Sequence, residues 1–339
     1  MIVIGMFHFR KDPDKVTRAY SYASIAKMEG VEFFYFTAKD VDLSGKKING
    51  SYYDSGKWLK KEFDFPDVIV NVVGPITPKQ KEIYYELNKL IPFTAFPVGT
   101  KLSVYNKIKK GKDFSDYLIP YQRLKNPVEV LKFINEFPKA VIKPISGNHG
   151  NKIVFVEHVG DNYLINDSGI KLSMNKMEFF DYAGQLLSLN KMVIQKYISC
   201  RKKTGEAYDF RLHLQKDKEG NWKNTVIYPK IGSTEKIATN LGQGGQIAVL
   251  DCFLAKEFQK ESTNVKRYLE VFAIQFANHF DKLYKYEFDE LGIDVGLDEE
   301  MKLWIYEVNW RPGHMFIELK TAKYAISYAI YLATKQVKE

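Results

Sequence analysis

The sequence predicts an α/β domain with a parallel sheet, followed by a longer region of mixed α+β structure. Near the N-terminus, apolar runs at 2–6, 31–37 and 67–73 have the composition of buried strands, and residues 78–89 have the spacing of an amphipathic helix. Strands that alternate with helices are typical of a parallel sheet with helices on its faces. Residues 290–309 instead alternate apolar and polar side chains on both sides of a turn, which predicts a β-hairpin.

Turn and capping signals place the limits of the first elements. Asp12, followed by Pro13, predicts the start of a helix, and Gly30 predicts its end. The pair Asn49-Gly50 predicts a tight turn between two short strands.

The remaining elements divide the chain into three parts. We predict an N-terminal α/β domain over 1–100, a middle segment over 101–190 and a final segment over 191–339. The elements predicted beyond residue 100 are, in order, helices at 102–110 and 127–136, strands at 139–144, 152–157 and 162–166, a helix at 175–188, strands at 192–198, 208–216 and 222–230, a helix at 254–283, strands at 290–297 and 302–309, and a helix that ends near 336.

The composition is that of an ordinary globular protein without a membrane span. The 339 residues are 45% hydrophobic, and no apolar run approaches the roughly 20 residues that a membrane helix needs. No basic segment precedes the first apolar run, so we expect a strand there and not a signal peptide. Cys200 and Cys252 form no CxxC pair, and such sparse cysteines favour a reducing compartment. We therefore expect a cytoplasmic protein.

The formal net charge of +9 comes from 50 basic and 41 acidic residues and favours anionic partners. Most of the basic residues are scattered, which is typical of a solvated surface. No zinc finger or aromatic RNA-binding strand is present, so nucleic acid is not expected as the main partner. Phosphates, acidic small molecules and acidic polymers remain open.

The predicted hairpin holds a group of oxygen-bearing side chains. Glu307 and Asn309 are two residues apart on one strand, so both point to the same face, and Asp294 on the partner strand can share that face. Two carboxylates and an amide oxygen suit Mg²⁺, which is usually completed by water and substrate phosphates. A Glu-x-Asn alone more often marks a polar face that meets water, but the third oxygen donor and the Arg-Pro-Gly that follows favour a metal site.

A lysine followed by a glycine-rich loop offers a second signal. Lys143 ends a predicted strand, and the loop after it contains Ser146, Gly147 and Gly150. Glycines let backbone N–H groups approach an anion and let the loop move, so the lysine is well placed to hold a polyphosphate. The stretch is not a P-loop, because no GxxxxGK[ST] is present. By itself, a lysine at a strand end is usually a solvated edge residue.

Two later segments carry further candidates. The strand that ends at Ile198 leads into a polar loop, whose backbone could bind a nucleobase edge and whose Glu206 could bind ribose hydroxyls. Arg211 alternates with apolar residues in its strand, and a charged residue in such a place needs a partner or a ligand. Lys230 lies at the end of the next strand.

Taken in this order, the segments resemble the ATP-grasp superfamily, and within it the YheC/YheD family, described as endospore coat-associated. The resemblance covers about residues 101–335. It rests on Asn106-Lys107 in a helix, VIKPISGNHGNKI, VIQKYI, DFRLHL, TNLGQGG (239–245), and GIDVG followed by LWIYEVNWRPG. The 13-residue step from Asp294 to Glu307 also agrees with the metal site of the superfamily.

The resemblance implies that ATP lies between two lobes, over 101–190 and 191–339, behind a pre-ATP-grasp domain. It also implies which residues would contact each part of the ligand. The phosphates would contact Lys107 and Lys143 under a mobile cover formed by Ser146, Gly147 and Gly150. The adenine edge would contact Gln195, Lys196, Tyr197 and Ile198, and the ribose would contact Glu206. One or two Mg²⁺ ions would be bound by Asp294, Glu307 and Asn309.

The chemistry that the resemblance implies is ATP-dependent ligation of a carboxylate and an amine through an acylphosphate. Arg211 and Lys230 are the candidate cations near the acylphosphate, although related ligases often have arginine in place of Lys230. No covalent nucleophile is needed, so we expect Cys200 to be structural. The candidates on the acceptor side are Asn240, Gly244, Gly245, Arg311 and His314. Surface charges on a capped loop would explain the last two equally well.

Other functions remain open beside the ligase. A structural coat protein or nucleotide-binding protein could keep the fold without turnover, a kinase-like enzyme would leave a stable phosphorylated product, and a nucleic-acid-binding protein would not need ATP. The presence together of the carboxylates, the asparagine and both lysines favours the ligase. The positive charge suggests that at least one substrate is acidic, such as an amino acid, a peptide or an envelope polymer. The substrates and the oligomeric state stay undetermined, and an association with spores follows only from the resemblance.

Overall fold

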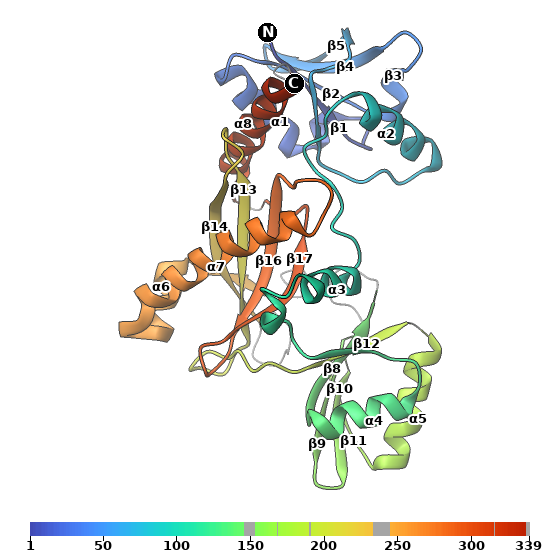
Figure 1. The fold of residues 1–339 in the computed structure, drawn as a ribbon, viewed down its shortest axis with the longest axis vertical. Coiled ribbons are helices and arrows are strands. Elements are labelled where there is room, and N and C mark those ends of the chain that lie inside the picture. The colour runs from blue at the N-terminus through green and yellow to red at the C-terminus, as the bar shows by residue number, and fades with distance from the viewer. Residues whose placement is uncertain (146–152, 168, 190, 233–244, 315, 337–339) are drawn as a thin grey trace.

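Three β-sheets follow one another along the long axis of the molecule (Figure 1). The computed structural model describes residues 1–145, 153–167, 169–189, 191–232, 245–314 and 316–336. The first sheet lies at one end beside the C-terminal helix, the sheet from residues 208–309 lies in the middle, and the sheet from residues 121–196 lies at the far end.

The first sheet is mixed, and the predicted parallel strands form one side of it. β1 (Val3–Phe7) pairs in parallel with β2 (Glu32–Phe36) and with β6 (Val68–Asn71). These strands are buried almost throughout, as expected for apolar runs in a parallel sheet. The antiparallel strands of the sheet are β3 (Val41–Asp42), β4 (Lys47–Asp54) and β5 (Lys57–Asp64).

The turn predicted at Asn49-Gly50 is wrong, because both residues lie inside β4. The chain reverses instead at Ser55 and Gly56, which have φ angles of 46° and 84°. Gly50 is needed for packing, since a Cβ atom built on it would lie 2.4 Å from Cδ2 of Phe34. The Asn-Gly pair therefore marks a close approach of an aromatic ring to the backbone.

The helix predicted from Asp12 to Gly30 is divided in two. Asp12 caps only a short 3-10 turn, η1 (Pro13–Lys15), by accepting a hydrogen bond from the backbone N–H of Asp14. Helix α1 (Thr17–Met28) begins after Val16 and has no side-chain cap. The capping signal at Asp12 thus predicted correctly that a helical turn begins at Pro13. It did not predict that this turn is separate from α1.

Helices cover both faces of the first sheet. On one face, α2 (Pro78–Leu90) packs near Phe34 and Ile69. On the other face, α1 and the C-terminal helix α8 (Glu318–Gln336) pack near Ile4. None of the described helices, α8 included, is long and apolar enough to cross a membrane.

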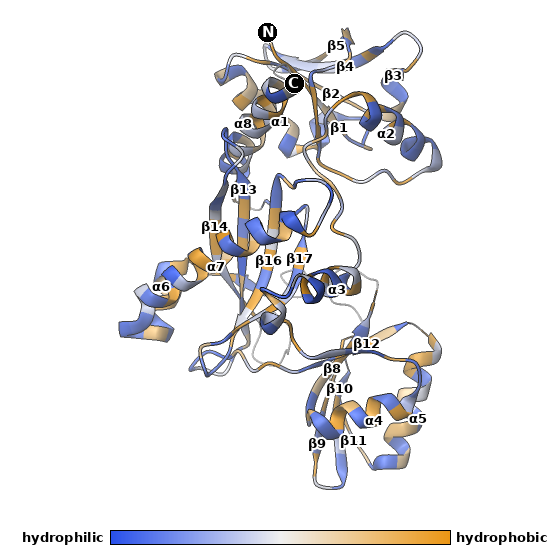
Figure 2. Cartoon of the chain, viewed as in Figure 1, coloured by the Kyte–Doolittle hydropathy of each residue, from blue (hydrophilic) through white to orange (hydrophobic). Residues whose placement is uncertain are grey.

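The second sheet is antiparallel, in the order β11-β10-β9-β8-β12-β7. Its strands are β7 (Tyr121–Arg123), β8 (Lys139–Pro144), β9 (Val154–Val159), β10 (Asn162–Asp167), β11 (Ile170–Met174) and β12 (Met192–Lys196). Helices α4 (Pro127–Glu136) and α5 (Lys176–Leu189) pack on it, and Val130, Phe133 and Ile134 of α4 are buried at helical spacing. Figure 2 shows the apolar and polar residues that alternate along these two helices.

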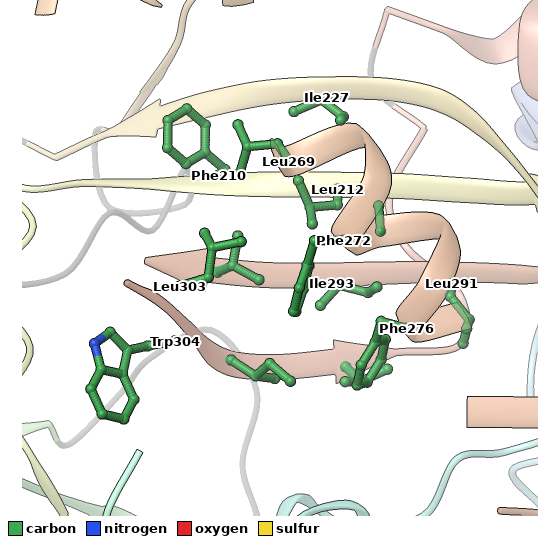
Figure 3. Packing of buried hydrophobic residues seen from close by; sticks show 14 of the residues in the cluster. Phe210, Leu212, Ile227, Leu269, Phe272, Phe276, Leu291, Ile293, Leu303 and Trp304 are labelled. Atoms are coloured by element: carbon green, nitrogen blue, oxygen red, sulfur yellow. The ribbon is translucent and has the colours of Figure 1, made fainter. Parts of the chain in front are cut away.

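The third sheet is antiparallel, in the order β15-β14-β13-β16-β17, and contains the predicted hairpin. Its strands are β13 (Tyr208–Lys216), β14 (Trp222–Ile231), β15 (Gln246–Ile247), β16 (Glu290–Leu297) and β17 (Leu303–Asn309). Phe272 and Phe276 of α7 (Ser262–Lys282) pack on one face, over Leu212 and Ile293 (Figure 3). This apolar packing fixes the strands that carry polar side chains on the opposite face.

The long helix predicted over 254–283 is wrong as a single element. It consists of α6 (Leu250–Phe258) and α7, joined by the 3-10 turn Gln259–Glu261. Gln259 has a φ angle of 51°, which is uncommon for a residue with a side chain and interrupts the helical backbone.

Three elements lie outside the segments in which the sequence placed them. β12 was assigned to the segment 191–339 but pairs with β7 and β8 of the second sheet. Helix α3 (Lys101–Gly111) was assigned to the segment 101–190 but packs in the core of the third sheet. Helix α8 ends the chain but packs on α1 of the N-terminal part. Each predicted segment thus contains an element that packs with another segment. The limits of the three segments stay a prediction.

Candidate functional site

Charged side chains form a row across the polar face of the third sheet. The strand register sets Asp209 opposite Lys230, Arg211 opposite Asp294, and Asp294 opposite Glu307. These residues come from the neighbouring strands β14, β13, β16 and β17, and paired residues in a sheet point to the same face. The structure therefore brings Asp294 and Glu307 together, as the sequence predicted.

A β-bulge brings Glu307 onto this face. Val295 pairs with Ile305, whereas its neighbour Asp294 pairs with Glu307, so Tyr306 is an extra residue in β17. Without it, Glu307 would point in the same direction as Ile305, whose side chain is buried in the core. Sequence reasoning missed this bulge, because LWIYEVN reads as a regular strand.

Asp294 is held by two cations. Arg211 donates from Nε to Oδ1 over 2.7 Å and from Nη2 to Oδ2 over 3.0 Å, and Nζ of Lys230 lies 2.9 Å from Oδ1. Burial raises the pKa of the Asp294 carboxyl, but the charges of Arg211 and Lys230 outweigh burial and hold this pKa well below its usual range. Lys230 also lies 3.0 Å from Oδ1 of Asp209. Asp294 is therefore ionised and oriented, and its Oδ2 keeps a lone pair for a further ligand.

A pocket opens beside Glu307 and Asn309. It is lined by residues 98–101 at the start of α3, by Ile145 after β8, and by residues 307–310. The pocket therefore lies between the second and third sheets. Nζ of Lys101 lies 3.5 Å from Oε2 of Glu307, and both side chains are about one-third exposed.

Lys143 on β8 interacts electrostatically with two residues of this pocket. Burial and, to a lesser extent, the positive charge of Lys101 lower the pKa of the Lys143 ammonium group to about 8, against the opposing effect of the carboxylate of Glu307. A buried cation whose charged form is disfavoured is stabilised by an anionic ligand. Lys143 thus lies near enough to Lys101 and Glu307 to respond to their charges, and Ile145, two residues after it, lines the pocket, in which a polyphosphate would supply that anion.

The structure directs Lys107 elsewhere. Its Nζ atom donates to the carbonyl oxygen of Leu283 over 3.3 Å and lies 4.4 Å from the ring centre of Tyr284. Lys107 does not line this pocket, whereas Lys101, which sequence reasoning missed, does, and the predicted contact of Lys107 with phosphate stays a prediction. A signal was present, because Thr100 caps α3 and so places Lys101 in the first turn of a helix.

Several predicted residues lie outside the described part of the chain: Ser146, Gly147, Gly150, Asn240 and Gly244. Gly245 is described and directly precedes β15, in which Ile247 pairs with Lys230. Gly245 therefore lies near the end of β14, where Lys230 joins the charged row.

The segment predicted to contact adenine makes several contacts within the protein. Nε2 of Gln195 donates to the hydroxyl of Tyr105 over 3.1 Å, and the backbone N–H groups of Lys196 and Tyr197 donate to carbonyl oxygens. Ile198 is buried. These two N–H groups already donate hydrogen bonds within the protein. Binding of a base by this segment therefore stays a prediction, and it would have to use other backbone groups of the segment.

Glu206 lies in the loop before β13. It accepts hydrogen bonds from the hydroxyl of Thr204 and, over 3.1 Å, from Nζ of Lys202. The bond from Thr204 and those from the Glu206 backbone N–H and from Lys202 lower the pKa of the Glu206 carboxyl to about 2. The carboxylate is therefore ionised at neutral pH, as an acceptor of ribose hydroxyls would need to be.

Arg311 and His314 follow β17 and lie in buried surroundings. Arg311 stacks on the ring of Trp310 at 3.5 Å, and its Nε and Nη2 atoms have no hydrogen-bond partner among the described residues. Burial lowers the pKa of the Arg311 guanidinium to about 9. His314 contacts Glu290 and Thr321 and is 6% exposed. The alternative that His314 is a surface charge is therefore wrong.

Cys200 is 4% exposed and lies 3.2 Å from the hydroxyl of Tyr306. Burial raises the pKa of its thiol to about 12. A thiol that stays protonated at neutral pH is a poor nucleophile, which agrees with the structural role predicted for it.

Comparison with known proteins first gives the class of the fold. The chain has the ATP-grasp fold. It is similar to the ATP-grasp ligase PsnB complexed with a phosphomimetic variant of minimal precursor, Mg and ADP, with a TM-score of 0.58 and 9% identity over 97% of this chain and 98% of PsnB. It is also similar to a RiPP-associated ATP-grasp ligase of Chryseobacterium gregarium in complex with ADP and a leader and core peptide, with a TM-score of 0.54 and 13% identity over 97% of each chain.

The sequence then gives the family. The model of the YheC/D-like ATP-grasp family matches residues 90–332, and the chain belongs to this family. The endospore coat-associated protein YheD of Bacillus subtilis (strain 168) is 23% identical over 327 residues, which are 90% of this chain and 71% of YheD. The ATP-grasp fold and the family predicted from the sequence are thus confirmed.

Proposed function

We propose that this protein is an ADP-forming ligase that joins a substrate carboxylate to an amine through an acylphosphate. The observation that carries the proposal is the approach of Lys101 to Glu307 in the pocket, with Lys143 two residues before the pocket residue Ile145 and the ionised carboxylate of Asp294 paired with Glu307 in the sheet. These charges match the phosphates and the divalent cation of Mg-ATP. The solved ATP-grasp ligases with this fold that contain ADP support the same assignment.

Asp294, Glu307 and Asn309 would hold Mg²⁺. All three offer hard oxygen donors, and the strand register directs them to one face. When bound, Mg²⁺ supplies positive charge that neutralises the phosphate oxygens and the charge that develops during phosphoryl transfer. The hydrogen bonds from Arg211 and Lys230 fix the orientation of Asp294 before any ligand arrives.

Lys101 and Lys143 would bind the phosphates of ATP. Lys101 takes the place that the sequence assigned to Lys107, since its Nζ atom lies in the pocket. Binding of phosphate would favour the charged form of Lys143 and so offset the cost of its burial. The contacts of Glu206 with ribose and of the segment 195–198 with adenine belong to the same proposal.

The reaction would proceed in two steps. An oxygen of the substrate carboxylate attacks the γ-phosphorus, and the bond to ADP breaks. The amine then attacks the acyl carbon of the acylphosphate, and phosphate leaves with the bonding electrons. Arg211 and Lys230 would stabilise the negative charge of the acylphosphate, because both are cations on the same sheet face as Asp294.

We infer that at least one substrate is acidic and that a peptide is a suitable candidate. The net charge of +9 favours an acidic partner, and the C. gregarium ligase with this fold is complexed with a leader and core peptide. Arg311, with two unpartnered N–H groups among the described residues, and Gly245 would lie on the acceptor side. A spore-associated location would extend the printed description of YheD to this chain, whereas a cytoplasmic location rests on the sparse cysteines alone.

A two-substrate assay of ADP release tests the proposal. Purified protein is mixed with ATP, Mg²⁺ and pairs of acids or acidic peptides with amines, and ADP, phosphate and coupled product are measured. We expect ADP release that requires Mg²⁺ and both substrates, that is lost in Lys101→Ala and Lys143→Ala, and that persists in the matched control Lys107→Ala. Equal loss in the control would contradict the assignment of Lys101. A stable phosphorylated product without an amine would instead indicate a kinase.

A further inference from the structure

A second group of ligand-type side chains lies on the same sheet face as the charged row, further along the strands, with His213 two residues after Arg211. His213, Glu290 and His314 meet in the interior, where their side chains are 0%, 7% and 4% exposed. Nε2 of His213 lies 2.8 Å from Oε1 of Glu290, and Nε2 of His314 lies 2.5 Å from the same oxygen. The ligand atoms of all three residues lie within 4.8 Å of one another.

The hydrogen bonds around His314 leave a place for a cation. The hydroxyl of Thr321 lies 3.0 Å from the carbonyl oxygen of Glu318, to which it can donate, and 2.9 Å from Nδ1 of His314, from which it accepts when Nδ1 carries the proton. With the Nδ1 atom as donor, the Nε2 atom of neutral His314 carries only a lone pair. That lone pair faces a carboxylate oxygen, which also carries only lone pairs. In this tautomer, a second proton on the ring or a metal ion lies between the two atoms.

We propose that His213, Glu290 and His314 bind a transition-metal ion, with Zn²⁺ as the best match. Two imidazoles and one carboxylate are a donor set that Zn²⁺ uses in proteins. Zn–N and Zn–O bonds of about 2.0–2.2 Å place neighbouring ligand atoms about 3.3 Å apart. The two histidine–glutamate pairs, now 2.8 and 2.5 Å apart, would therefore open by less than about 1 Å to admit the ion.

The surroundings of His314 have the form of a support for a metal ligand. A ligating histidine usually donates its other N–H group to a fixed acceptor, which sets the tautomer and the ring orientation. Thr321 is that acceptor here, and it is fully buried at the start of α8. Nδ1 of His213 has no hydrogen-bond partner within the described chain. It therefore favours neither the metal-bound nor the metal-free site. The second oxygen of Glu290 or a water would complete the coordination.

The site would tie the last helix of the chain to the third sheet. His213 comes from β13, Glu290 from β16, and His314 from the segment before α8. Helix α8 packs on α1 of the N-terminal part, so the ion would also fasten that part to the middle of the molecule. This role is structural and does not depend on the proposed ligase activity.

Metal content and metal binding of the full chain test this proposal. Protein purified without chelator is analysed for bound metals, then stripped and titrated with Zn²⁺ and with Co²⁺. We expect one equivalent of Zn²⁺, a visible Co²⁺ spectrum of a nitrogen- and oxygen-ligated ion, and a melting temperature that rises by several degrees when Zn²⁺ is added. Absence of stoichiometric binding in the wild-type protein would overturn the proposal.

Three variants locate the ion. We expect His314→Gln and His213→Gln to lose the Co²⁺ spectrum and the thermal shift, and Glu307→Gln to keep both. Loss of the spectrum in Glu307→Gln alone would place the ion in the carboxylate row and overturn the assignment. The spectrum of the wild-type protein keeps the test decisive even where a histidine variant does not fold.

Discussion

The two faces of the third sheet use the same strands in opposite ways. Toward α7, Leu212 and Ile293 pack under phenylalanine rings in an apolar core (Figure 3). Toward the pocket, their chain neighbours Arg211 and Asp294 form a charged row. Because side chains alternate along a strand, a rigid core can hold a charged site in a fixed geometry from behind. We therefore expect substitutions on the core face to lower the free energy of unfolding, and substitutions on the polar face to change both stability and activity.

The largest effect on stability is expected from the core face. Phe276→Ala removes a fully buried ring and should lower the free energy of unfolding by about 3–5 kcal/mol. The fraction that remains folded should bind ATP with unchanged affinity, since Phe276 does not line the pocket. Urea unfolding gives the stability. The control is Val271→Ala on the same helix, where the side chain is 44% exposed and a change within about 0.5 kcal/mol is expected.

Asp294→Asn should be the most destabilising change on the polar face. It leaves the buried cations Arg211 and Lys230 with less counter-charge, and breaking a buried ion network in this way costs about 3 kcal/mol or more. Denaturation at neutral pH measures the cost. Asp64→Asn removes an exposed surface pair instead and should change stability by less than about 0.5 kcal/mol. Similar small changes in both variants would mean that the row contributes nothing to the fold.

Glu307→Gln should separate function from stability on the same face. Glu307 is about one-third exposed and pairs only loosely with Lys101, so its loss should change the free energy of unfolding by less than about 1 kcal/mol. Mg²⁺-dependent ADP release should fall by about 100-fold, because the variant keeps the size of the side chain but loses the charged metal ligand. An unfolding curve and an ADP assay on one preparation make the comparison. Activity close to that of the wild type would contradict the role of Glu307.

The smallest expected effect is the pH dependence that Lys143 introduces. Its pKa is lowered to about 8, mainly by burial, so the charged form costs the folded state stability at pH values below about 8. The cost is relieved as pH rises from 8 toward the unfolded value of about 10.5. Lys143→Met should therefore be more stable than the wild type at pH 7, by about 1–2 kcal/mol, and the difference should vanish near pH 10.5.

The same group should make ATP binding depend on pH. Affinity should fall as pH rises above 8, because Lys143 loses the charge that binds phosphate. Lys143→Arg keeps its charge over this range and should show a flatter profile. Calorimetric titrations at pH 7 and pH 9.5 compare the two proteins, and identical profiles would exclude Lys143 as the titrating group.

Sequence patterns predicted those features that depend on neighbouring residues. The period of two along a strand was enough to place Glu307 and Asn309 on one face, and the turn between the hairpin strands was enough to add Asp294. The bulge at Tyr306 could not be predicted, because it depends on pairing with β16. The true turn at Ser55-Gly56 was missed for a similar reason, since Asn49-Gly50 is a stronger local turn signal that packing against an aromatic ring overrides.

Features that depend on long-range packing were beyond prediction. Lys101 and Lys107 lie on one helix, and only the position of α3 against the third sheet decides which of them reaches the pocket. The meeting of His213, Glu290 and His314 joins residues up to 101 positions apart and follows no local spacing. By contrast, the fold itself could be predicted, because several motifs occur in one order along the chain.

Calorimetric titration of ATP with and without Mg²⁺ tests the central claim most directly, namely that the polar face of the third sheet and the pocket beside it form a nucleotide site. We predict that the wild-type protein binds ATP when Mg²⁺ is present, that Glu307→Gln and Lys143→Ala lose this binding, and that Lys107→Ala retains it. A folded wild-type protein that binds no ATP at any Mg²⁺ concentration would contradict the account and leave the fold without a nucleotide-dependent role.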